Sequence, residues 1–490
     1  MSGPSLLPLQ AGEQYRFTFA VEACVGCHSC EVACAEQNGT PVEGAWRRVG
    51  ELEGGTYPHT RRFSLSIACN HCVEPTCLSG CPTNAYEKLA NGIVVHHEAE
   101  CVGCQYCMWN CPYEVPVFSP VRKVVSKCDM CRPRIDAGQA PACVGACPTQ
   151  AIGVEPVDVA RWRADHHEAD APGLPPASIT LSTTRVVLPA GLPEDMAAAN
   201  ERPPSPEHPH WPLVVLTLLT QLSLGMVTAT WLLELGGGER GRLGGAAVAA
   251  LAAGVIALGA SLFHLGRPAR ALKAVRNLRT SWLSREVALF GLFSALCGAY
   301  SASWLLPGVP GTALGGAAVV AGAAGVWASA RLYLVPARPV WDSPRTPAAF
   351  FATTGAVGPV ATLLCIDRAA LAAGPVRALV VVAMAATACQ VVNGLLLRRS
   401  VRRSASRQYA GTGWLLAGPL RHLVLWRAVA AGVTLALLAS ALAVPFAGPA
   451  AGGRMAGALV VAAAGELVGR YLFYVSVVPY RVAGGFFGPR

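Results

Sequence analysis

The chain has 490 residues, 53% of them hydrophobic, and its mean hydropathy of +0.41 exceeds that of an ordinary soluble protein. Residues 1–211 hold 15 Lys+Arg and 23 Asp+Glu, whereas residues 212–490 hold 24 and 6. Because most of the basic excess lies in short loops between apolar runs, membrane topology explains it, and no nucleic-acid-binding motif accompanies it. Composition therefore predicts membrane segments and excludes nucleic acid as a partner.

Sixteen cysteines between residues 24 and 147 form four groups of four. In chain order the groups are Cys24, Cys27, Cys30, Cys34; Cys69, Cys72, Cys77, Cys81; Cys101, Cys104, Cys107, Cys111; and Cys128, Cys131, Cys143, Cys147. Groups one and three read C-x2-C-x2-C-x3-C, the spacing by which three thiolates bind one iron-sulfur cluster while the fourth reaches another. No group lacks a member, so the sequence predicts four 4Fe-4S clusters.

Zinc and disulfides are the two alternatives for these cysteines. Structural zinc uses paired C-x2-C knuckles, not runs of four cysteines followed, as in groups two to four, by proline. Disulfides need an oxidising compartment, and residues 1–20 have no secretory signal. Iron-sulfur ligation is the interpretation that the spacing favours.

Around the cysteines, strands are predicted over residues 16–21 and 92–96. The segment offers few residues for a conventional apolar core, so we expect the clusters to fill the middle of a tandem ferredoxin-like α+β domain over residues 1–155. Residues 156–211 are rich in proline and predict an extended linker lying over this head, with a strand-like run at 179–188.

The remainder predicts an all-α polytopic membrane domain over residues 212–490. Runs of about 20 apolar residues are long enough to cross a bilayer. They cover residues 212–234, 243–263, 287–306, 313–335, 348–366, 377–397, 422–445 and 456–479. The sequence thus predicts eight transmembrane helices, many of them rich in small residues that allow close helix contact.

The loops on the two sides of the eight spans differ in basic residues. The side carrying the head has sixteen: Arg267, Arg270, Lys273, Arg276, Arg279, Arg285, Arg338, Arg345, Arg398, Arg399, Arg402, Arg403, Arg407, Arg421, Arg481 and Arg490. The opposite side has five: Arg240, Arg242, Arg368, Arg377 and Arg454. This bias predicts a head on the cytoplasmic side of a bacterial or archaeal cytoplasmic membrane. Docking of the acidic head on these arginines is the competing explanation.

Short motifs in both halves carry a family likeness. They are Ser66 to Cys72, Cys77 to Pro82, Asn110 to Tyr113, Lys127 to Cys131, His210 to Leu213, His264 to Pro268 with Ser281 to Glu286, and Gly465 to Arg470. The head resembles the four-cluster iron-sulfur subunits of molybdopterin oxidoreductases, most closely that of dimethyl sulfoxide reductase, and the membrane half resembles the matching anchor subunit. In that family these are two chains, whereas here they are fused.

The resemblance implies nested cluster ligation. Its four ligand sets are a first set of Cys24, Cys27, Cys30 and Cys147; a second of Cys34, Cys128, Cys131 and Cys143; a third of Cys69, Cys72, Cys77 and Cys111; and a fourth of Cys81, Cys101, Cys104 and Cys107. Spacing alone requires only that the last cysteine of a group cross to another cluster.

A wire of clusters needs a membrane donor or acceptor, and quinone fits because its electrons travel with protons that ionisable side chains carry. His264 and Glu286 are the expected proton-transfer residues, at the head-side ends of the second and third spans. An interfacial histidine bonded to a backbone carbonyl, and a helix N-terminal charge, remain alternatives for the two.

Three other ionisable residues lie in or near the bilayer. Arg331, Glu466 and Arg470 are candidates to line a quinone pocket, although Glu466 and Arg470, four residues apart, equally predict a structural ion pair. The spans offer only His264 and His422 as imidazoles, both near a surface, so no haem is expected.

These features predict the electron-transfer and anchor subunit of a membrane molybdoenzyme, exchanging electrons between quinone and a separate molybdopterin catalytic subunit. The closest resemblance implies quinol oxidation, as in dimethyl sulfoxide reductase. A cytoplasm-facing sulfite dehydrogenase that reduces quinone is the rival within the class. A quinone-linked subunit of a redox assembly without molybdenum is the alternative of another class.

Overall fold

The computed structural model describes residues 6–41, 46–199, 203–305, 310–368 and 371–482. The chain divides into two compact units. The head unit comprises Met1–Pro203, Ala269–Ser281 and Pro479–Arg490, and the membrane unit comprises Pro204–Pro268 and Trp282–Val478. Arg490, one of the sixteen basic residues counted on the head side, lies outside the described residues.

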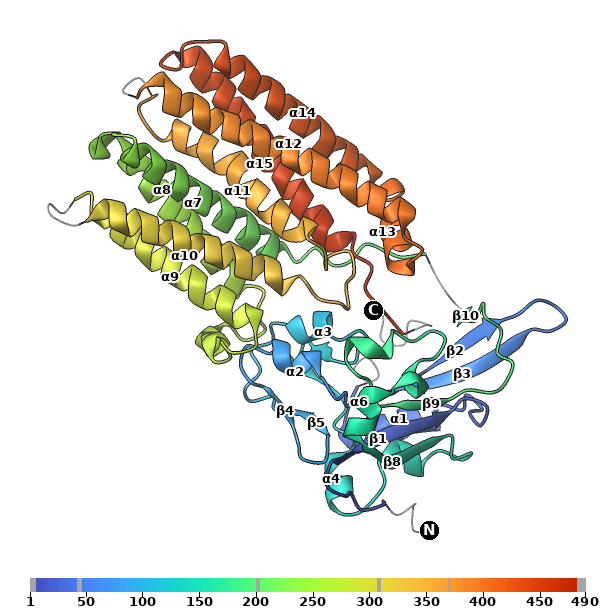
Figure 1. Ribbon diagram of the computed structural model, residues 1–490. Helices are drawn as coiled ribbons and strands as arrows, with labels where there is room; N and C mark the ends of the chain where they lie inside the picture. The colour runs from blue at the N-terminus through green and yellow to red at the C-terminus, as the bar shows by residue number, and fades with distance from the viewer. Residues whose placement is uncertain (1–5, 42–45, 200–202, 306–309, 369–370, 483–490) are drawn as a thin grey trace. The chain divides into compact units, whose positions relative to one another are not determined.

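Two three-stranded sheets and two hairpins make up the β-structure of the head (Figure 1). In the first sheet, β1 (Glu13–Ala20) lies between antiparallel β8 (Ile152–Asp158) and parallel β9 (Arg185–Val187). In the second, β2 (Arg48–Gly54) lies between β3 (Arg61–Ile67) and β10 (Ala197–Ala198). The hairpins are β4 (Tyr86–Lys88) with β5 (Val94–His96), and β6 (Val117–Ser119) with β7 (Val124–Ser126). The predicted strands at 16–21 and 92–96 therefore correspond to β1 and β5.

Short helices carry or adjoin the cysteines. They are α1 (Ser29–Asn38), α2 (Thr76–Gly80), α3 (Tyr106–Asn110), α4 (Arg132–Asp136) and α5 (Ala142–Gly145), followed by α6 (Val159–Ala164). Helix α1 packs against α5, and α2 packs against α3. Cysteine group one is thus brought to group four, and group two to group three.

The expectation that the head lacks a conventional apolar core is wrong. Phe17 and Phe19 point inward from β1, Leu65 and Ile67 from β3, and all four are at most 3% exposed. They pack with several cysteines in one cluster. Alternation along β1 and β3 supplies this face, because every second side chain of a strand points to the same side.

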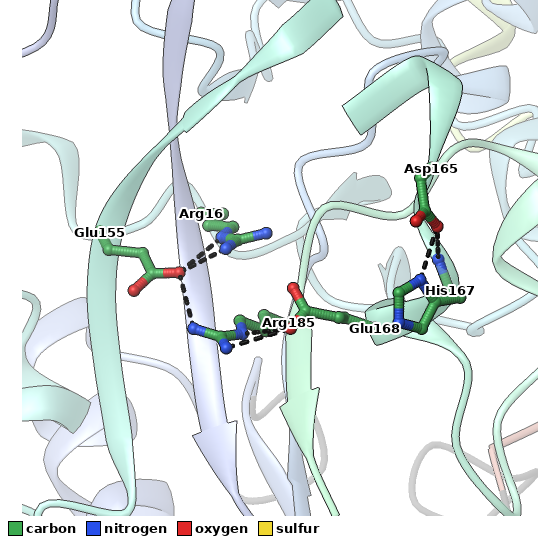
Figure 2. A network of polar contacts seen from close by, with 6 residues as sticks. All are labelled: Arg16, Glu155, Asp165, His167, Glu168 and Arg185. Atoms are coloured by element: carbon green, nitrogen blue, oxygen red, sulfur yellow. Dashed lines mark hydrogen bonds and ion pairs between the residues drawn. The ribbon is translucent and has the colours of Figure 1, made fainter. Parts of the chain in front are cut away.

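Residues beyond 155 are integrated into the head by charge pairing as well as by β9 and β10. Glu155 on β8 accepts from Arg16 on β1, with Nη2 and Oε1 2.5 Å apart, and lies 3.8 Å from Arg185 on β9 (Figure 2). Arg185 also pairs with Glu168 at 3.0 Å. Of the strand-like run at 179–188, only residues 185–187 form a strand. Thr183 and Thr184, which precede it, bond Asn70 through their hydroxyls.

Eight helices of the described chain are long and apolar enough to span a membrane, as predicted. They are α7 (Trp211–Leu235), α8 (Arg240–Leu262), α9 (Trp282–Ala302), α10 (Gly311–Leu332), α11 (Arg345–Leu364), α12 (Ala373–Arg403), α14 (Arg421–Leu442) and α15 (Pro449–Val475). Two details differ from the prediction. Helix α12 continues through Arg398, Arg399, Arg402 and Arg403, which were expected in a loop, and an unpredicted helix α13 (Arg407–Ala417) precedes α14.

Helix α7 is the centre of the membrane unit, since it packs against α8, α10, α11 and α15 (Figure 1). In the most apolar 18-residue stretch of α7, 67% of the residues are buried, against 17% in the corresponding stretch of α14. At the crossing with α11 the backbones touch: a Cβ on Gly225 would lie 2.3 Å from Thr354 O, and one on Gly358 only 2.4 Å from Gly225 Cα. Only glycine fits both positions.

Candidate functional site

The four C-x2-C loops share one backbone feature. The residue before the second cysteine has a positive φ in each: Gly26 (67°), His71 (43°), Gly103 (71°) and Met130 (60°). This left-handed turn directs amides of the loop toward the first sulfur, as in Gly103 N–H to Cys101 Sγ at 3.4 Å and Met130 N–H to Cys128 Sγ at 3.3 Å. Such donors stabilise thiolates and tune cluster potentials.

Two cavities in the head are each lined by four cysteines, three from one group and the fourth from another. One is lined by Cys24, Cys27, Cys30 and Cys147. The other is lined by Cys69, Cys72, Cys77 and Cys111. These are the members of the first and third sets. Near them, Ala151 N–H donates to Cys147 Sγ at 3.2 Å and Thr180 Oγ1 to Cys72 Sγ at 3.1 Å.

Within the second set, and likewise within the fourth, the cysteines are electrostatic neighbours of one another. Cys34 interacts with Cys131 and Cys143, and Cys128 with Cys34 and Cys143. The Asn38 amide contacts two of these sulfurs, Cys34 Sγ at 3.7 Å and Cys131 Sγ at 3.9 Å.

In the fourth set, Cys107 interacts with the other three members, Cys81, Cys101 and Cys104. Each of the four sets is therefore brought together in space.

Burial decides how these thiols ionise. Burial is the main cause, and the neighbouring Cys143 the next, that raises the pKa of Cys34 to about 12. Burial is also the main cause that raises the pKa values of Cys72 and Cys104 to about 12. Exposed Cys27 has a lowered pKa because Ser29 hydrogen-bonds it. Thiols so grouped ionise together only with cationic metal among them, so the donor chemistry fits 4Fe-4S clusters.

In the membrane unit, His264 lies two residues beyond the end of α8, and Glu286 lies in the second turn of α9. The Glu286 side chain is buried, and its Oε1 has no hydrogen-bond partner among the described residues. Ser329 lies close to the same carboxyl group. A buried carboxylate oxygen that lacks a donor is nevertheless costly, which marks a position for a ligand or an exchanged proton.

Sequence reasoning gave no role to the residues that link His264 and Glu286. The His210 ring lies 5.3 Å from the His264 ring and 6.2 Å from Tyr474, and the Tyr474 and Tyr333 hydroxyls are 2.5 Å apart. Both tyrosines interact electrostatically with Glu286. Burial first, then the neighbouring His264, lowers the pKa of His210 to about 3. His210 in a His-Trp-Pro motif at the start of a span was the only available signal.

Of the other predicted membrane residues, Arg470 is an electrostatic neighbour of Tyr333 and Tyr474. Arg331 stacks over Trp282 at 5.1 Å. Among the described residues, Glu466 and Arg470 meet through the Thr353 hydroxyl and not directly: Thr353 Oγ1 is 2.6 Å from Glu466 Oε2 and 3.4 Å from Arg470 Nη2. Gln221 also accepts from Arg470 at 2.8 Å. The polar link between α11 and α15 replaces the simple ion pair.

Residues Ala269–Ser281, which lie between His264 and Glu286 in sequence, belong to the head unit. Its short 3-10 helix, η4 (Pro268–Val275), and the following turn contact the loops of the fourth cysteine set. Asn277 Nδ2 donates to Cys81 O at 2.8 Å, and Ser281 Oγ to Gly80 O at 2.8 Å. Lys273 lies 2.9 Å from Glu100, beside Cys101. The hydrogen bond from Lys273 is the main reason that the pKa of Glu100 is lowered.

Comparison with known proteins is consistent with both halves. Residues 61–156 match the family of 4Fe-4S dicluster domains, and residues 206–475, more than half of the chain, match the DMSO reductase anchor subunit (DmsC) family. A chain of the anaerobic dimethyl sulfoxide reductase of Haemophilus influenzae is 40% identical over 177 residues, 34% of this chain and 86% of that protein. Its namesake in Escherichia coli is 38% identical over 175 residues, 34% of this chain and 85% of that protein.

A subunit of the sulfite dehydrogenase of Allochromatium vinosum is 35% identical over 160 residues, 28% of this chain and 67% of that protein. The anchor match and the eight apolar helices make this a multi-pass membrane protein. The protein belongs to the dimethyl sulfoxide reductase family, as a fusion of its iron-sulfur subunit with its membrane anchor subunit.

Proposed function

We propose that this protein carries electrons between the membrane quinone pool and a molybdopterin catalytic subunit, in the direction of quinol oxidation. The support is the fusion of a cysteine-rich head, similar to a chain of dimethyl sulfoxide reductase, with the matching anchor. When bound, 4Fe-4S clusters supply one-electron carriers. The chain's own residues would hold them, admit quinol and take up its protons.

The proposed cluster count is four, held by the four sets as the nested pattern assigns them. The shared cavities of the first and third sets, and the mutual proximity of cysteines in the second and fourth, support this assignment. We propose the division 1–155, 156–211 and 212–490 as the boundaries of head, linker and anchor, with residues 156–199 packed on the head.

The observation that carries the quinone proposal is the buried carboxylate of Glu286, whose Oε1 has no hydrogen-bond partner among the described residues. Oxidation of quinol releases two electrons and two protons, and general bases must be within reach of the two hydroxyl groups. Glu286 Oε1 has a free lone pair for one hydroxyl, and His264 would accept the other proton. His210, Tyr333 and Tyr474 would orient these groups, and Arg331, Glu466 and Arg470 remain outer candidates for the pocket.

The catalytic partner would dock over the first cysteine set. Cys27 is exposed, and Val25 and Val32 beside it are 66% and 64% exposed. Apolar residues exposed at the most accessible set of thiols are suited to a protein partner that must approach closely for electron transfer.

A cytoplasm-facing sulfite dehydrogenase is the second candidate, since a sulfite dehydrogenase subunit is among the relatives. The excess of basic residues on the head side favours that orientation. Docking within the head explains part of the excess: Arg270 bonds Ala99 O, Lys273 and Arg276 bond Glu100, and Arg481 pairs with Glu114. The remaining basic residues still outnumber the five on the opposite side, so we propose a cytoplasmic head.

Replacement of His264 by alanine tests the quinone site. We expect the purified variant to keep its iron content and cluster spectra while its rate of cluster reduction by a quinol analogue falls by about 100-fold or more, the usual contribution of a general base. Unchanged reduction by quinol would remove His264 from the mechanism.

A further inference from the structure

Lys127 is a buried cation among cysteine sulfurs. Lys127 directly follows β7 and is only 3% exposed. It lines the same cavity as the cysteines of the third set. Its Nζ lies 3.6 Å from Cys69 Sγ and 2.8 Å from Cys128 O, and it also donates to Val94 O. The amine is therefore fixed between the third set and a member of the second.

No carboxylate among the described residues pairs with Lys127. Its main electrostatic neighbours are Cys69, Cys77 and Cys128. A buried ammonium without a counter-charge is strongly unfavourable, so its position makes physical sense only when the surrounding sulfurs carry negative charge.

Arg47 repeats the pattern at the first and second sets. It is 2% exposed, and its Nη1 donates to Ser66 Oγ at 3.1 Å, whereas Nε and Nη2 have no hydrogen-bond partner among the described residues. Its main electrostatic neighbours are cysteines of these two sets: Cys143, Cys30, Cys128 and Cys34. The Arg47 guanidinium also stacks over the Phe17 ring at 4.7 Å. Cysteine sulfurs are therefore the main groups among the described residues that could balance this second buried cation.

We propose that Lys127 and Arg47 are built-in counter-charges of the iron-sulfur clusters and that Lys127 raises the reduction potential of the cluster held by the third set. The inference rests on the proposed ligand assignment. A fixed positive charge beside a cluster stabilises its reduced state, which carries one more negative charge than the oxidised state. The main electrostatic neighbours of Cys104 and Cys107 in the fourth set include no cation, so the potential should change between the third and fourth sets.

Redox titration followed by EPR of the purified full chain tests this. Lys127→Gln removes the charge but keeps an N–H donor for the carbonyl groups, and Lys127→Arg keeps the charge. We expect Lys127→Gln to lower the midpoint of one cluster by at least a tenfold change in its reduction equilibrium, about 59 mV for one electron. Lys127→Arg should change it much less. Lys123→Gln, at an exposed position of the same hairpin, is the matched control and should leave every midpoint unchanged.

The outcomes separate the two claims. If Lys127→Gln retains its iron and no midpoint falls, or if Lys123→Gln lowers a midpoint equally, the inference is wrong. If Lys127→Gln fails to assemble clusters, Arg47→Gln against Arg47→Lys decides: the charge-retaining variant should keep the wild-type midpoints, and equal midpoints in both would overturn the inference. A wild-type chain without iron would contradict the proposed function itself.

Discussion

Two buried ionisable residues with opposite charge tendencies mark the chemistry of this protein. Among the described residues, Oε1 of Glu286 in α9 is a buried acceptor without a donor, and Lys127 in the head is a buried cation without a carboxylate. Burial of such a group costs free energy when no ligand or cluster compensates it. The cost is offset if a quinol hydroxyl meets the first group and a cluster meets the second.

Glu286→Gln should uncouple quinol from the clusters. The amide keeps the size of the carboxylate but accepts no proton, so we expect cluster reduction by a quinol analogue to slow by about 100-fold or more, while reduction by dithionite stays normal. Glu234→Gln is the matched control, because Glu234 near the opposite end of α7 is already bonded by Tyr300 and Thr312, both within 2.9 Å. Equal rates in Glu286→Gln and the wild type would assign Glu286 to structure alone.

At this scale the sequence predicted the residues whose type and spacing are diagnostic. The sixteen cysteines, His264 and Glu286 were proposed as site residues, because thiol spacing and intramembrane charge can be read from the sequence, and their roles remain predictions. His210, Tyr333 and Tyr474 were not, because their significance comes from ring and hydroxyl contacts between helices distant in sequence. Lys127 stands out in the sequence only as part of the Lys127 to Cys131 motif, because its burial depends on the fold of the head.

Among the helices, the close crossing of α7 and α11 bears on function, because α7 begins directly after His210 and packs against four other helices of the membrane unit. In lipid, close backbone packing through small residues takes the place of the hydrophobic effect. The two glycines at this crossing therefore determine how closely the helices pack.

Gly225→Val should destabilise the membrane unit severely. Its Cβ would strike the Thr354 carbonyl oxygen at 2.3 Å, and because backbone cannot rotate away, the cost should exceed the about 1–3 kcal/mol typical of overpacking. Gly291→Val on α9 is the control, with nothing within 4 Å of its Cβ. The yield of monodisperse protein in detergent and its melting temperature measure the effect, and equal values for the two variants would show that the contact is not limiting.

The transmembrane helices could be predicted because one physical length, the thickness of the hydrocarbon layer, determines how many apolar residues they need. Eight apolar runs became eight helices because about 20 residues are needed to cross the hydrocarbon layer. Helix α13 was not predicted because its 11 residues are too few to cross a bilayer. The apolar core of the head was not predicted because its residues alternate along β1 and β3, in a segment where the cysteines dominate the pattern.

For the whole molecule, fusion fixes one anchor to one head in the same polypeptide. The proposed orientation has a direct test in alkaline phosphatase fusions, which are active only outside the cytoplasm. A fusion after Gly237 should be active and one after Ser404 inactive, because an odd and an even number of spans precede them. The reverse pattern would place the head outside the cytoplasm and favour the exported reductase.

The central claim is that sixteen cysteines hold four 4Fe-4S clusters that exchange electrons with quinone. Iron and acid-labile sulfide analysis of the anaerobically purified protein, followed by addition of a quinol analogue, tests it most directly. We predict about sixteen iron atoms and sixteen sulfides per polypeptide, and bleaching of the cluster absorbance by the quinol analogue. Zinc in place of iron, or clusters that no quinol reduces, would contradict the account.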